Sequence, residues 1–377
     1  MEEAKIQGAD LIKVINKMTL SLQGDLQSQA KQRYCFSGLS LYLALSMLQE
    51  GTSGVCLKEL EEKCGISSDK TTRQLILSKV QKSMATLLGT ESTAQYLMGN
   101  GLFLRDDTDV KADFKSVLQN SYKAAVGPLD KDQINKWVED QTNSKIKDLC
   151  DEIDPMMIAM LINAVYFKGN WAIPFEKSLT QDEPFAQNGN ESNQKKVPMM
   201  HLKKKYNNGI KKDKSGNFYH KLDYEGCNLS MVFCLPPKET PLGHSLDSDE
   251  KIESVTNWGK SRPMESQPMI PRFEMSTTLD LKTALQAKGV SEIFIDGANK
   301  FDGMFQDRSD VYVGKVVQKT FVQVNEEGTE AVAATKVEIM MRGIPPPPTP
   351  FHLNRPFSFY IIDNEGLILF NGAVNEL

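Results

Sequence analysis

The chain has 377 residues, of which 40% are hydrophobic and 25% are charged, and its formal net charge is -5 at pH 7. These proportions are typical of a globular protein, and the acidic balance excludes a general attraction to nucleic acid. No stretch in the middle of the chain has the composition of a linker, so we expect a single domain over residues 1–377. Any partner must therefore be selected by a local site.

The N-terminal segment carries no targeting signal that we recognise. The segment reads MEEAKIQGADLIKVINKM; it carries two acidic residues directly after Met1 and lacks the apolar run of a signal peptide. Apolar runs elsewhere are shorter than the roughly 20 residues of a membrane helix. We therefore expect a cytoplasmic protein without a membrane partner, and release from the cell by an unconventional route stays open. Six cysteines without metal or redox spacing suit free thiols in a reducing compartment.

The first part of the chain predicts helices. Apolar residues recur at helical spacing over residues 11–22, and residues 39–48 are apolar on nearly all sides, as expected of a buried helix. A further helix is predicted over residues 75–88. The helical pattern continues between residues 110 and 150, where Gly127-Pro128 breaks it.

From about residue 160 the pattern changes to that of β-strands. The segments are rich in β-branched and aromatic residues and bounded by turn residues, and they read LINAVYFKGNW, LSMVFCLP, VYVGKVVQKTFVQVN and FSFYIIDNEGLILFNGAV. Asn364-Glu365-Gly366 predicts a hairpin turn near the C-terminus. Helices first and strands later favour an α+β fold with large antiparallel sheets over alternating βαβ units.

The motifs of common enzyme and cofactor sites are absent from the sequence. It contains no GxxxxGK[ST], no GxGxxG after a strand, no GxSxG, no HExxH and no CxxC. None of the four histidines lies within helical reach of another, so we predict no metal site and no cofactor; they are His201, His220, His244 and His352. A Ser-His-Asp site assembled from distant residues stays open, because a triad is recognised by geometry. We expect a protein that is not an enzyme.

A basic run around an Asn-Asn-Gly turn is a candidate site for a polyanion. Its lysines are Lys203, Lys204, Lys205, Lys211, Lys212 and Lys214. Clustered cations attract a polyanion through the local potential, despite the acidic total charge. A solvated hairpin tip explains the same composition, and we favour that interpretation.

Residues 325–350 combine features that do not fit one regular element. The segment reads NEEGTEAVAATKVEIMMRGIPPPPTP. At a period of two, one face carries only small residues, namely Thr329, Ala331, Ala333 and Thr335. Such a strand could enter between two others without displacing a packed core. A helix over residues 330–341 is the alternative, but so short and isolated a helix is marginal in water.

The end of this segment predicts an exposed loop. Residues 345–348 are four prolines, which can only extend as polyproline, so the segment should stand away from the body. A long exposed loop in a compact domain is usually functional or disordered. The apolar residues that precede Arg342 make a poor disordered linker and a suitable bait for a protease.

At these residues the sequence resembles a serpin, and the match covers nearly the whole chain. Residues 325–331, NEEGTEA, resemble the hinge that begins the family's reactive-centre loop. Residues 134–146 resemble its helical INxWVxxxTxxKI pattern, and residues 163–171 with Phe175 resemble its central strand motif. The series is completed by VPMM at 197–200, PRF at 271–273, RPF at 355–357 and LFNG at 369–372. The order of these motifs is highly specific. In lacking a leader, the sequence resembles the intracellular ov-serpins.

The resemblance implies the serpin fold, with three β-sheets, about nine helices and an exposed reactive-centre loop over about residues 326–350. In the family, a protease attacks this loop and forms an acyl-enzyme. The cleaved loop then inserts as a new strand into the sheet called sheet A and carries the trapped protease to the opposite pole. Serpin loop insertion is a known example of strand addition and of released strain.

Family spacing from the hinge Gly328 places Arg342 in the protease's specificity pocket, so the predicted cut is Arg342-Gly343. Arginine suits a pocket with a buried carboxylate, such as that of trypsin. A trypsin-like serine protease, bound covalently to a monomer, is therefore the predicted partner. A shift of one residue would place Met341 at the cut and select chymotrypsin-like or elastase-like enzymes.

The resemblance also locates the shutter and the breach, where sheet A opens. The matching residues are Ser37, Ser40, Asn163, Gln318 and Trp171. Gln318 stands where many members have a histidine, and because an amide can donate and accept, we expect a working shutter with a changed network. Gly38 replaces a usual proline, which should loosen the turn after Ser37.

A non-inhibitory serpin, acting as a binding or chaperone-like protein, is the main alternative. Bulky or charged hinge substitutions would have favoured it. The hinge residues here are Glu326, Glu327, Gly328, Thr329, Glu330, Ala331, Val332, Ala333, Ala334 and Thr335. Val332 is the only enlarged member and lies on the face opposite the small residues, so the hinge favours an inhibitor.

Overall fold

Helices dominate the first part of the chain, as the sequence predicts. The computed structural model describes residues 8–87, 94–105, 109–202, 209–238, 240, 242, 248–258, 265–297, 300–306, 311–327 and 348–377. Its α-helices are α1 Gly8–Ser21, α2 Gln23–Gln29, α3 Gly38–Gln49, α4 Gly54–Cys64, α5 Lys70–Leu87, α6 Ala112–Asn120, α7 Lys131–Gln141, α8 Ser248–Thr256 and α9 Lys282–Ala287. The three helices predicted before residue 100 correspond to α1, α3 and α5.

The helical prediction for residues 110–150 is correct only in part. Gly127 and Pro128 do not merely break a helix; they belong to the strand β3 Ala125–Pro128, between α6 and α7. Residues 142–150 also leave the helical path after α7. Asn143, Ser144 and Asp148 adopt positive φ values of 48°, 59° and 50°, which a right-handed helix cannot include.

Three sheets contain the strands, as the resemblance implies. Sheet A has the order β11 Phe273–Asp280, β12 Val313–Val324, β4 Ala159–Lys168, β2 Gln95–Leu104 and β3. Sheet B has the order β1 Arg33–Phe36, β15 Ile368–Val374, β14 Phe357–Asp363, β9 Leu229–Leu235, β8 Phe218–Asp223 and β7 Ile210–Lys212. Sheet C has the order β13 Thr349–His352, β10 Ser266–Pro271, β6 Gln194–His201 and β5 Gln181–Ala186. Short 3-10 helices span Lys177–Leu179, Gln187–Gly189 and Glu292–Phe294.

The expectation of antiparallel sheets needs correction, because sheets A and C are mixed. β12 pairs with β4 in parallel, β2 pairs with β3 in parallel, and β10 pairs with β13 in parallel. Long connections allow parallel neighbours, and the alternation within a strand does not encode its neighbour's direction. The predicted hairpin at residues 364–366 is confirmed between β14 and β15, with Gly366 at a φ of 88°.

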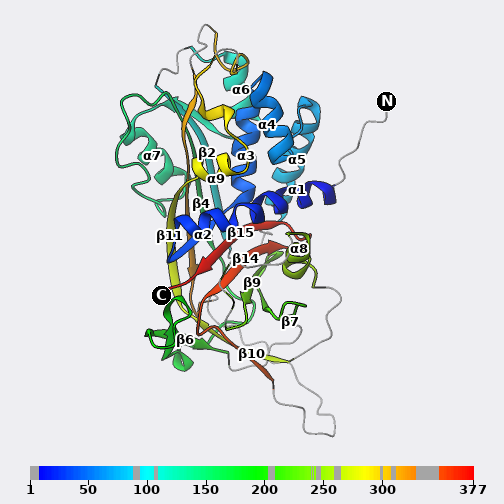
Figure 1. Cartoon of the computed structure of the whole chain (residues 1–377), viewed down its shortest axis with the longest axis vertical. Coiled ribbons are helices and arrows are strands. Elements are labelled where there is room, and N and C mark those ends of the chain that lie inside the picture. The colour runs from blue at the N-terminus through cyan, green and yellow to red at the C-terminus, as the bar shows by residue number, and fades with distance from the viewer. Residues whose placement is uncertain are drawn as a thin grey trace.

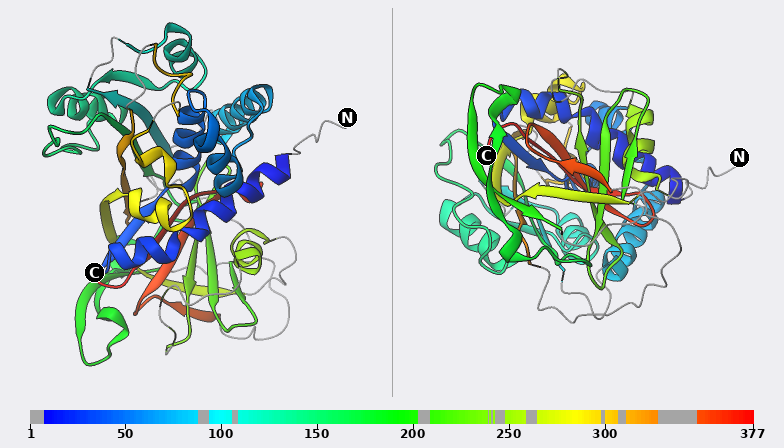
Figure 2. Two further views of the ribbon diagram at one scale, coloured as in Figure 1. Left: turned by 45° about the horizontal axis from the view of Figure 1, so that its top comes forward. Right: turned by 90° about the horizontal axis from the view of Figure 1, so that it is seen from below.

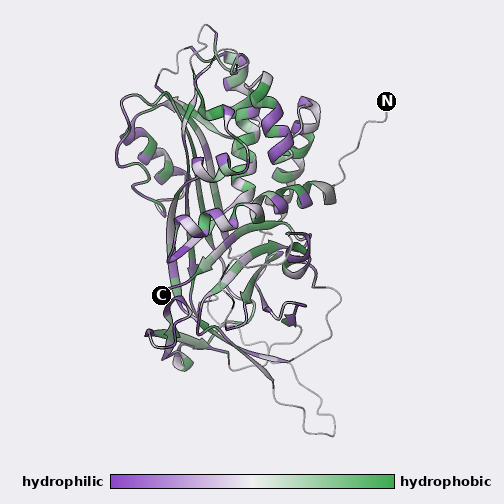
Figure 3. Cartoon of the chain, in the orientation of Figure 1, coloured by the Kyte–Doolittle hydropathy of each residue, from purple (hydrophilic) through white to green (hydrophobic). Residues whose placement is uncertain are grey.

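Sheet A lies between two groups of helices in the upper part of the molecule (Figure 1). α7 covers one face through Ile134 and Val138, which pack against Ile162 and Ala164 of β4. α3 covers the other face, and sheets B and C form the lower part of the molecule in Figure 1 and in the left view of Figure 2. Hydrophobic colouring along α3 and the central strands marks the core between these layers (Figure 3). Among the described residues, no helix is long and apolar enough to cross a membrane.

The start of α3 corrects the expectation of a loosened turn at Gly38. Ser37 is the N-cap of α3, and its hydroxyl accepts a hydrogen bond from the Ser40 amide at 3.3 Å. A Cβ atom on Gly38 would lie 1.8 Å from Oγ1 of Thr19 on α1. Gly38 is therefore needed for the close approach of α1 and α3.

Candidate functional site

The seam between β4 and β12 is the centre of sheet A. The two strands pair directly and in parallel, from Val313 opposite Ala159 to Val322 opposite Phe167. This ladder places β12 against β4 with no strand between them. A strand added here would have to separate the two and pair with both.

The first buried polar group at this seam joins β12 to the start of α3. The Ser37 main-chain amide donates to Oε1 of Gln318 at 2.7 Å, and Nε2 of Gln318 donates to the Ser37 carbonyl at 3.0 Å. Both residues have no exposed surface. The structure thus brings together two of the predicted shutter residues through a pair of amide-to-backbone hydrogen bonds.

The second buried polar group joins β4 to β2. Nδ2 of Asn163 donates to Oδ1 of Asn100 at 2.7 Å, and the Ser40 hydroxyl donates to the same oxygen at 3.3 Å. The sequence analysis missed Asn100, although a buried-looking Asn between Gly99 and Gly101 in an apolar strand was a usable signal. Asn100 and Asn163 are partners in the antiparallel pairing of β2 with β4.

Trp171, which the resemblance assigns to the breach, lies beside the C-terminal end of β12. Its indole stacks on Tyr224 at a centroid distance of 4.6 Å and an interplanar angle of 11°. Its Nε1 donates to the carbonyl of Asn325 at 2.9 Å. The predicted breach residue therefore contacts the first residue after β12, where the predicted hinge begins.

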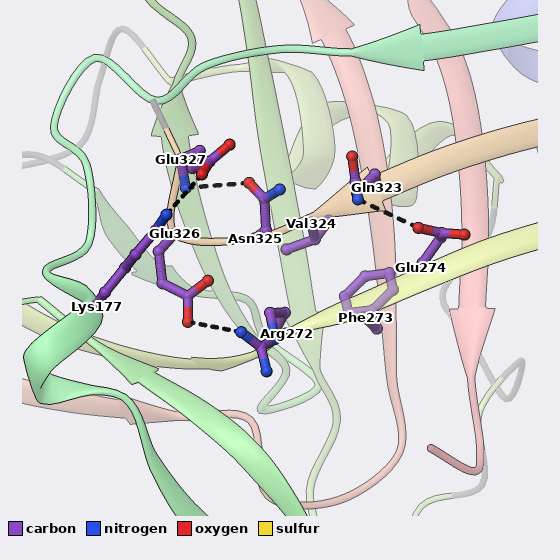
Figure 4. Close-up of a pocket in the computed structure, with 9 residues that line it drawn as sticks. All are labelled: Lys177, Arg272, Phe273, Glu274, Gln323, Val324, Asn325, Glu326 and Glu327. Atoms are coloured by element: carbon purple, nitrogen blue, oxygen red, sulfur yellow. Dashed lines mark hydrogen bonds and ion pairs between the residues drawn. The ribbon is translucent and has the colours of Figure 1, made fainter. Parts of the chain in front are cut away.

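A cleft of about 400 Å³ opens beside this contact (Figure 4). It is lined by Lys177, Arg272, Phe273, Glu274, Gln323, Val324, Asn325, Glu326 and Glu327. Its charged side chains come from three separated parts of the chain, and Figure 4 shows Arg272 and Lys177 directed at the two hinge glutamates. The cleft is thus a mixed-charge pocket at the start of the hinge.

The two hinge glutamates that the structure describes are held differently. Glu326 is 4% exposed; one carboxylate oxygen accepts from the Thr180 hydroxyl at 2.7 Å and lies 3.5 Å from Arg272 Nη1. Glu327 pairs at 2.6 Å with Lys177 on the surface, and this hydrogen bond holds the pKa of Glu327 below its usual range. The hinge residues 328–335, together with Met341, Arg342 and Gly343, lie outside the described residues.

The basic run does not form one hairpin tip, so the favoured interpretation is wrong in that respect. β6 ends at His201 in sheet C and β7 begins at Ile210 in sheet B, and the strands do not pair. Lys211 donates to the carbonyl of Asn257 at 2.8 Å and lies 4.2 Å from the ring centroid of Trp258, while burial lowers its pKa to about 8. Lys212 and Lys214 are exposed, and residues 203–205 lie outside the described part of the chain.

Histidines far apart in sequence meet in sheet C and behind it. Glu183 on β5 lies 2.5 Å from His201 Nε2 and 3.0 Å from His352 Nε2, so one carboxylate ties β5 to β6 and β13. His220 contacts the Ser266 hydroxyl at 2.8 Å, but both are fully buried, and burial lowers the pKa of His220 to about 3. This Ser-His pair faces the protein interior and cannot reach a substrate.

Sequence comparisons place the chain among proteins with this architecture. The family model described as "Serpin (serine protease inhibitor)" matches residues 13–377. Human neuroserpin is 34% identical over 358 residues, covering 90% of this chain and 85% of that protein. The horse leukocyte elastase inhibitor is 33% identical over 359 residues, covering 90% and 92%. Intracellular coagulation inhibitor 2 of Tachypleus tridentatus is 29% identical over 388 residues, covering 100% and 93%.

The fold is similar to that of a serpin whose structure has been solved. The thermophilic serpin Tengpin in its native state superposes with a TM-score of 0.83 at 26% identity, covering 100% of this chain and 96% of Tengpin. The family model spans almost the entire sequence, and the strands form three sheets. The chain therefore belongs to the serpin family.

Proposed function

We propose that this serpin inhibits trypsin-like serine proteases, is not itself an enzyme, and is cut at Arg342-Gly343. The observation that carries the proposal is the direct parallel ladder between β4 and β12, with the hinge leaving the end of β12. A loop strand that folds back from Val324 runs antiparallel to β12 and therefore also to β4. The seam thus offers hydrogen-bonding edges of suitable direction on both of its sides.

The sequence of the loop supports insertion on steric and energetic grounds. The small face from Thr329 to Thr335 adds little volume to a filled interior. If roughly a dozen backbone groups gain ladder bonds at about 0.5 to 1.5 kcal/mol each, insertion gains on the order of 10 kcal/mol before packing is counted. A gain of that size is comparable with the whole stability of an ordinary domain, so the uninserted fold must be kinetically held.

The specificity residue follows from the same loop. Arg342 carries a cationic fork on a long stem, which fits a pocket with a buried carboxylate. We propose that the protease remains as a covalent acyl-enzyme on a monomeric serpin. Its serine ester at Arg342 persists because insertion moves the protease away and distorts its catalytic site.

An elastase-like or chymotrypsin-like target is the second candidate. It requires Met341 in the specificity pocket, and the 33% identical relative is named a leukocyte elastase inhibitor. A non-inhibitory binding protein is the third candidate; it predicts cleavage without a trapped protease.

Location and a cofactor are further parts of the proposal. The relative named intracellular coagulation inhibitor supports a cytoplasmic protein, with release by an unconventional route as the alternative. A polyanion would bind the exposed Lys212 and Lys214 with their basic neighbours in sequence. Lys211 contributes less, because its ammonium group is engaged by Asn257 and Trp258.

Incubation with trypsin and, in parallel, with elastase tests the proposal. The expected result is a complex with trypsin that survives denaturing electrophoresis. The released C-terminal peptide should have the mass of a peptide that begins at Gly343. A complex with elastase and a peptide that begins at Arg342 would favour Met341 instead. Complete cleavage by both enzymes without any complex would contradict inhibition.

A further inference from the structure

Gln318 and Asn163 are direct neighbours across the β4–β12 seam. They are paired in the parallel register of the two strands, and both are fully buried. Equivalent positions in adjacent parallel strands point their side chains to the same face of a sheet. The two amides could therefore hydrogen-bond to each other, but each bonds away from the seam.

The buried polar network behind sheet A passes from one side of this seam to the other through Ser37 and Ser40 at the start of α3, and not through a bond between β4 and β12 side chains. On the β12 side, Gln318 bonds to the main chain of Ser37, and Thr320 donates to the Cys35 carbonyl at 2.8 Å. On the β4 side, Asn163 bonds to Asn100. Within the described part of the chain, no side-chain hydrogen bond joins β4 to β12.

An unused acceptor shows that the missing bond between the two strands has an energetic cost. Oδ1 of Asn163 is buried and has no hydrogen-bond partner in the described structure. Leaving a buried acceptor unpaired is unfavourable, because it has lost its water without gaining a donor. A donor at position 318 aimed across the seam would satisfy this oxygen, but Gln318 is long enough to place both ends of its amide on Ser37.

We propose that Gln318 is a positioning residue that keeps the seam free of side-chain hydrogen bonds and so speeds the entry of a strand between β4 and β12. Each backbone bond that breaks when the seam opens is replaced by one to the entering strand. A side-chain bond across the seam would have no such replacement and would add to the barrier. This role rests on the loop insertion proposed above.

Peptide uptake measures seam opening without a protease. The probe is a synthetic peptide with the sequence of residues 329–341, TEAVAATKVEIMM, and its rate of uptake is followed by native electrophoresis. The main variant is Gln318→Asn, whose shorter amide cannot span both Ser37 groups. Identical amides in register on adjacent parallel strands form hydrogen-bonded ladders, so this amide should donate to Asn163. Gln318→His, with a ring donor of another shape, is the second variant.

The expected result is that Gln318→Asn slows uptake roughly three- to tenfold, as one net hydrogen bond across the seam would. In an Asn163→Ala background the same substitution should change the rate by less than about twofold, because its partner is gone. Gln318→His should repeat this coupling if Gln318→Asn does not fold.

Two failures can be told apart. If the wild-type protein takes up the peptide but neither variant slows uptake, or if the slowing persists without Asn163, the role of Gln318 is wrong and insertion stands. If the folded wild-type protein takes up no peptide, the insertion itself is wrong, and the role of Gln318 falls with it.

Discussion

The indole nitrogen of Trp171 donates a hydrogen bond to the carbonyl of Asn325 at 2.9 Å. Trp171 follows β4 in the chain and Asn325 follows β12, so this bond joins the segments that leave the two strands, beyond the end of their ladder. Glu326 continues the contact, because its buried carboxylate accepts a hydrogen bond from Thr180 and lies beside the half-exposed Arg272. The start of the hinge is therefore fixed by side chains of the body, independently of the rest of the loop.

Glu326→Gln should lower the free energy of unfolding by about 1 to 2 kcal/mol, because the amide keeps an acceptor for Thr180 but loses its charge beside Arg272. The half-exposed Arg272 moderates this cost through solvent screening. Urea denaturation of Glu326→Gln and of the control below measures this loss of stability. Glu327→Gln is the matched control and should leave the midpoint unchanged, since its pair with Lys177 is exposed. Equal losses in the two variants would refute the special role of Glu326.

Thr329→Arg should convert the inhibitor into a substrate, because it places a charge on the face that must become buried. Titration of trypsin against the variant should show cleaved serpin in place of covalent complex. Glu330→Arg, on the opposite face of the predicted strand, should still form the complex. Full trapping by Thr329→Arg would show that this face does not enter the sheet.

Lys319→Met should release the segment after α7 from sheet A. The Lys319 ammonium donates to the carbonyls of Lys147 and Asp148 at 2.6 and 3.0 Å. Loss of these charge-assisted bonds should cost about 1 to 3 kcal/mol and increase hydrogen exchange over residues 142–150. Lys319→Arg should restore much of the protection, and Lys315→Met on the same strand should not change it. Unchanged exchange in Lys319→Met would mean that apolar packing alone holds the segment.

Asp363 should make stability fall as the pH rises from about 4 to 6. Burial raises the pKa of Asp363 from 3.8 to about 6, so between these values the folded state binds more protons than the unfolded state. Asp363→Asn removes the charge and keeps an acceptor for the Glu365 and Leu367 amides. The variant should match the wild type below pH 4 and exceed its stability above pH 6 by at most about 3 kcal/mol. Thermal melts of both proteins across this pH range test the prediction. A difference in stability between them that does not change with pH would refute it.

Periodicity identified the long elements because each follows one strong local pattern. The apolar residues of α3 surround the whole helix, and the alternation along β12 persists over its length. β3 escaped prediction because Gly127 and Pro128 are strand breakers by propensity, and pairing with β2 at the sheet edge overrides that tendency. Parallel pairing was equally invisible, since strand direction depends on long connections.

Family motifs located the shutter residues but not their bonds. The sequence showed that Gln318 and Asn163 belong to one region, yet only the register shows that they face each other without bonding. Gly38 illustrates the same limit. The conformational freedom of glycine predicted a loose turn, whereas the close approach of Thr19, nineteen positions earlier in the chain, explains why a glycine is needed there. Tertiary contacts of this kind leave no local pattern.

The most direct test of the central claim compares thermal unfolding before and after a single cut within residues 328–343. Insertion of the cleaved loop between β4 and β12 should raise the unfolding temperature by more than about 10 °C, because a gain on the order of 10 kcal/mol is added to the fold. An unchanged or lowered unfolding temperature, with the cut confirmed by intact mass, would contradict the claim that this serpin works by inserting its loop into sheet A.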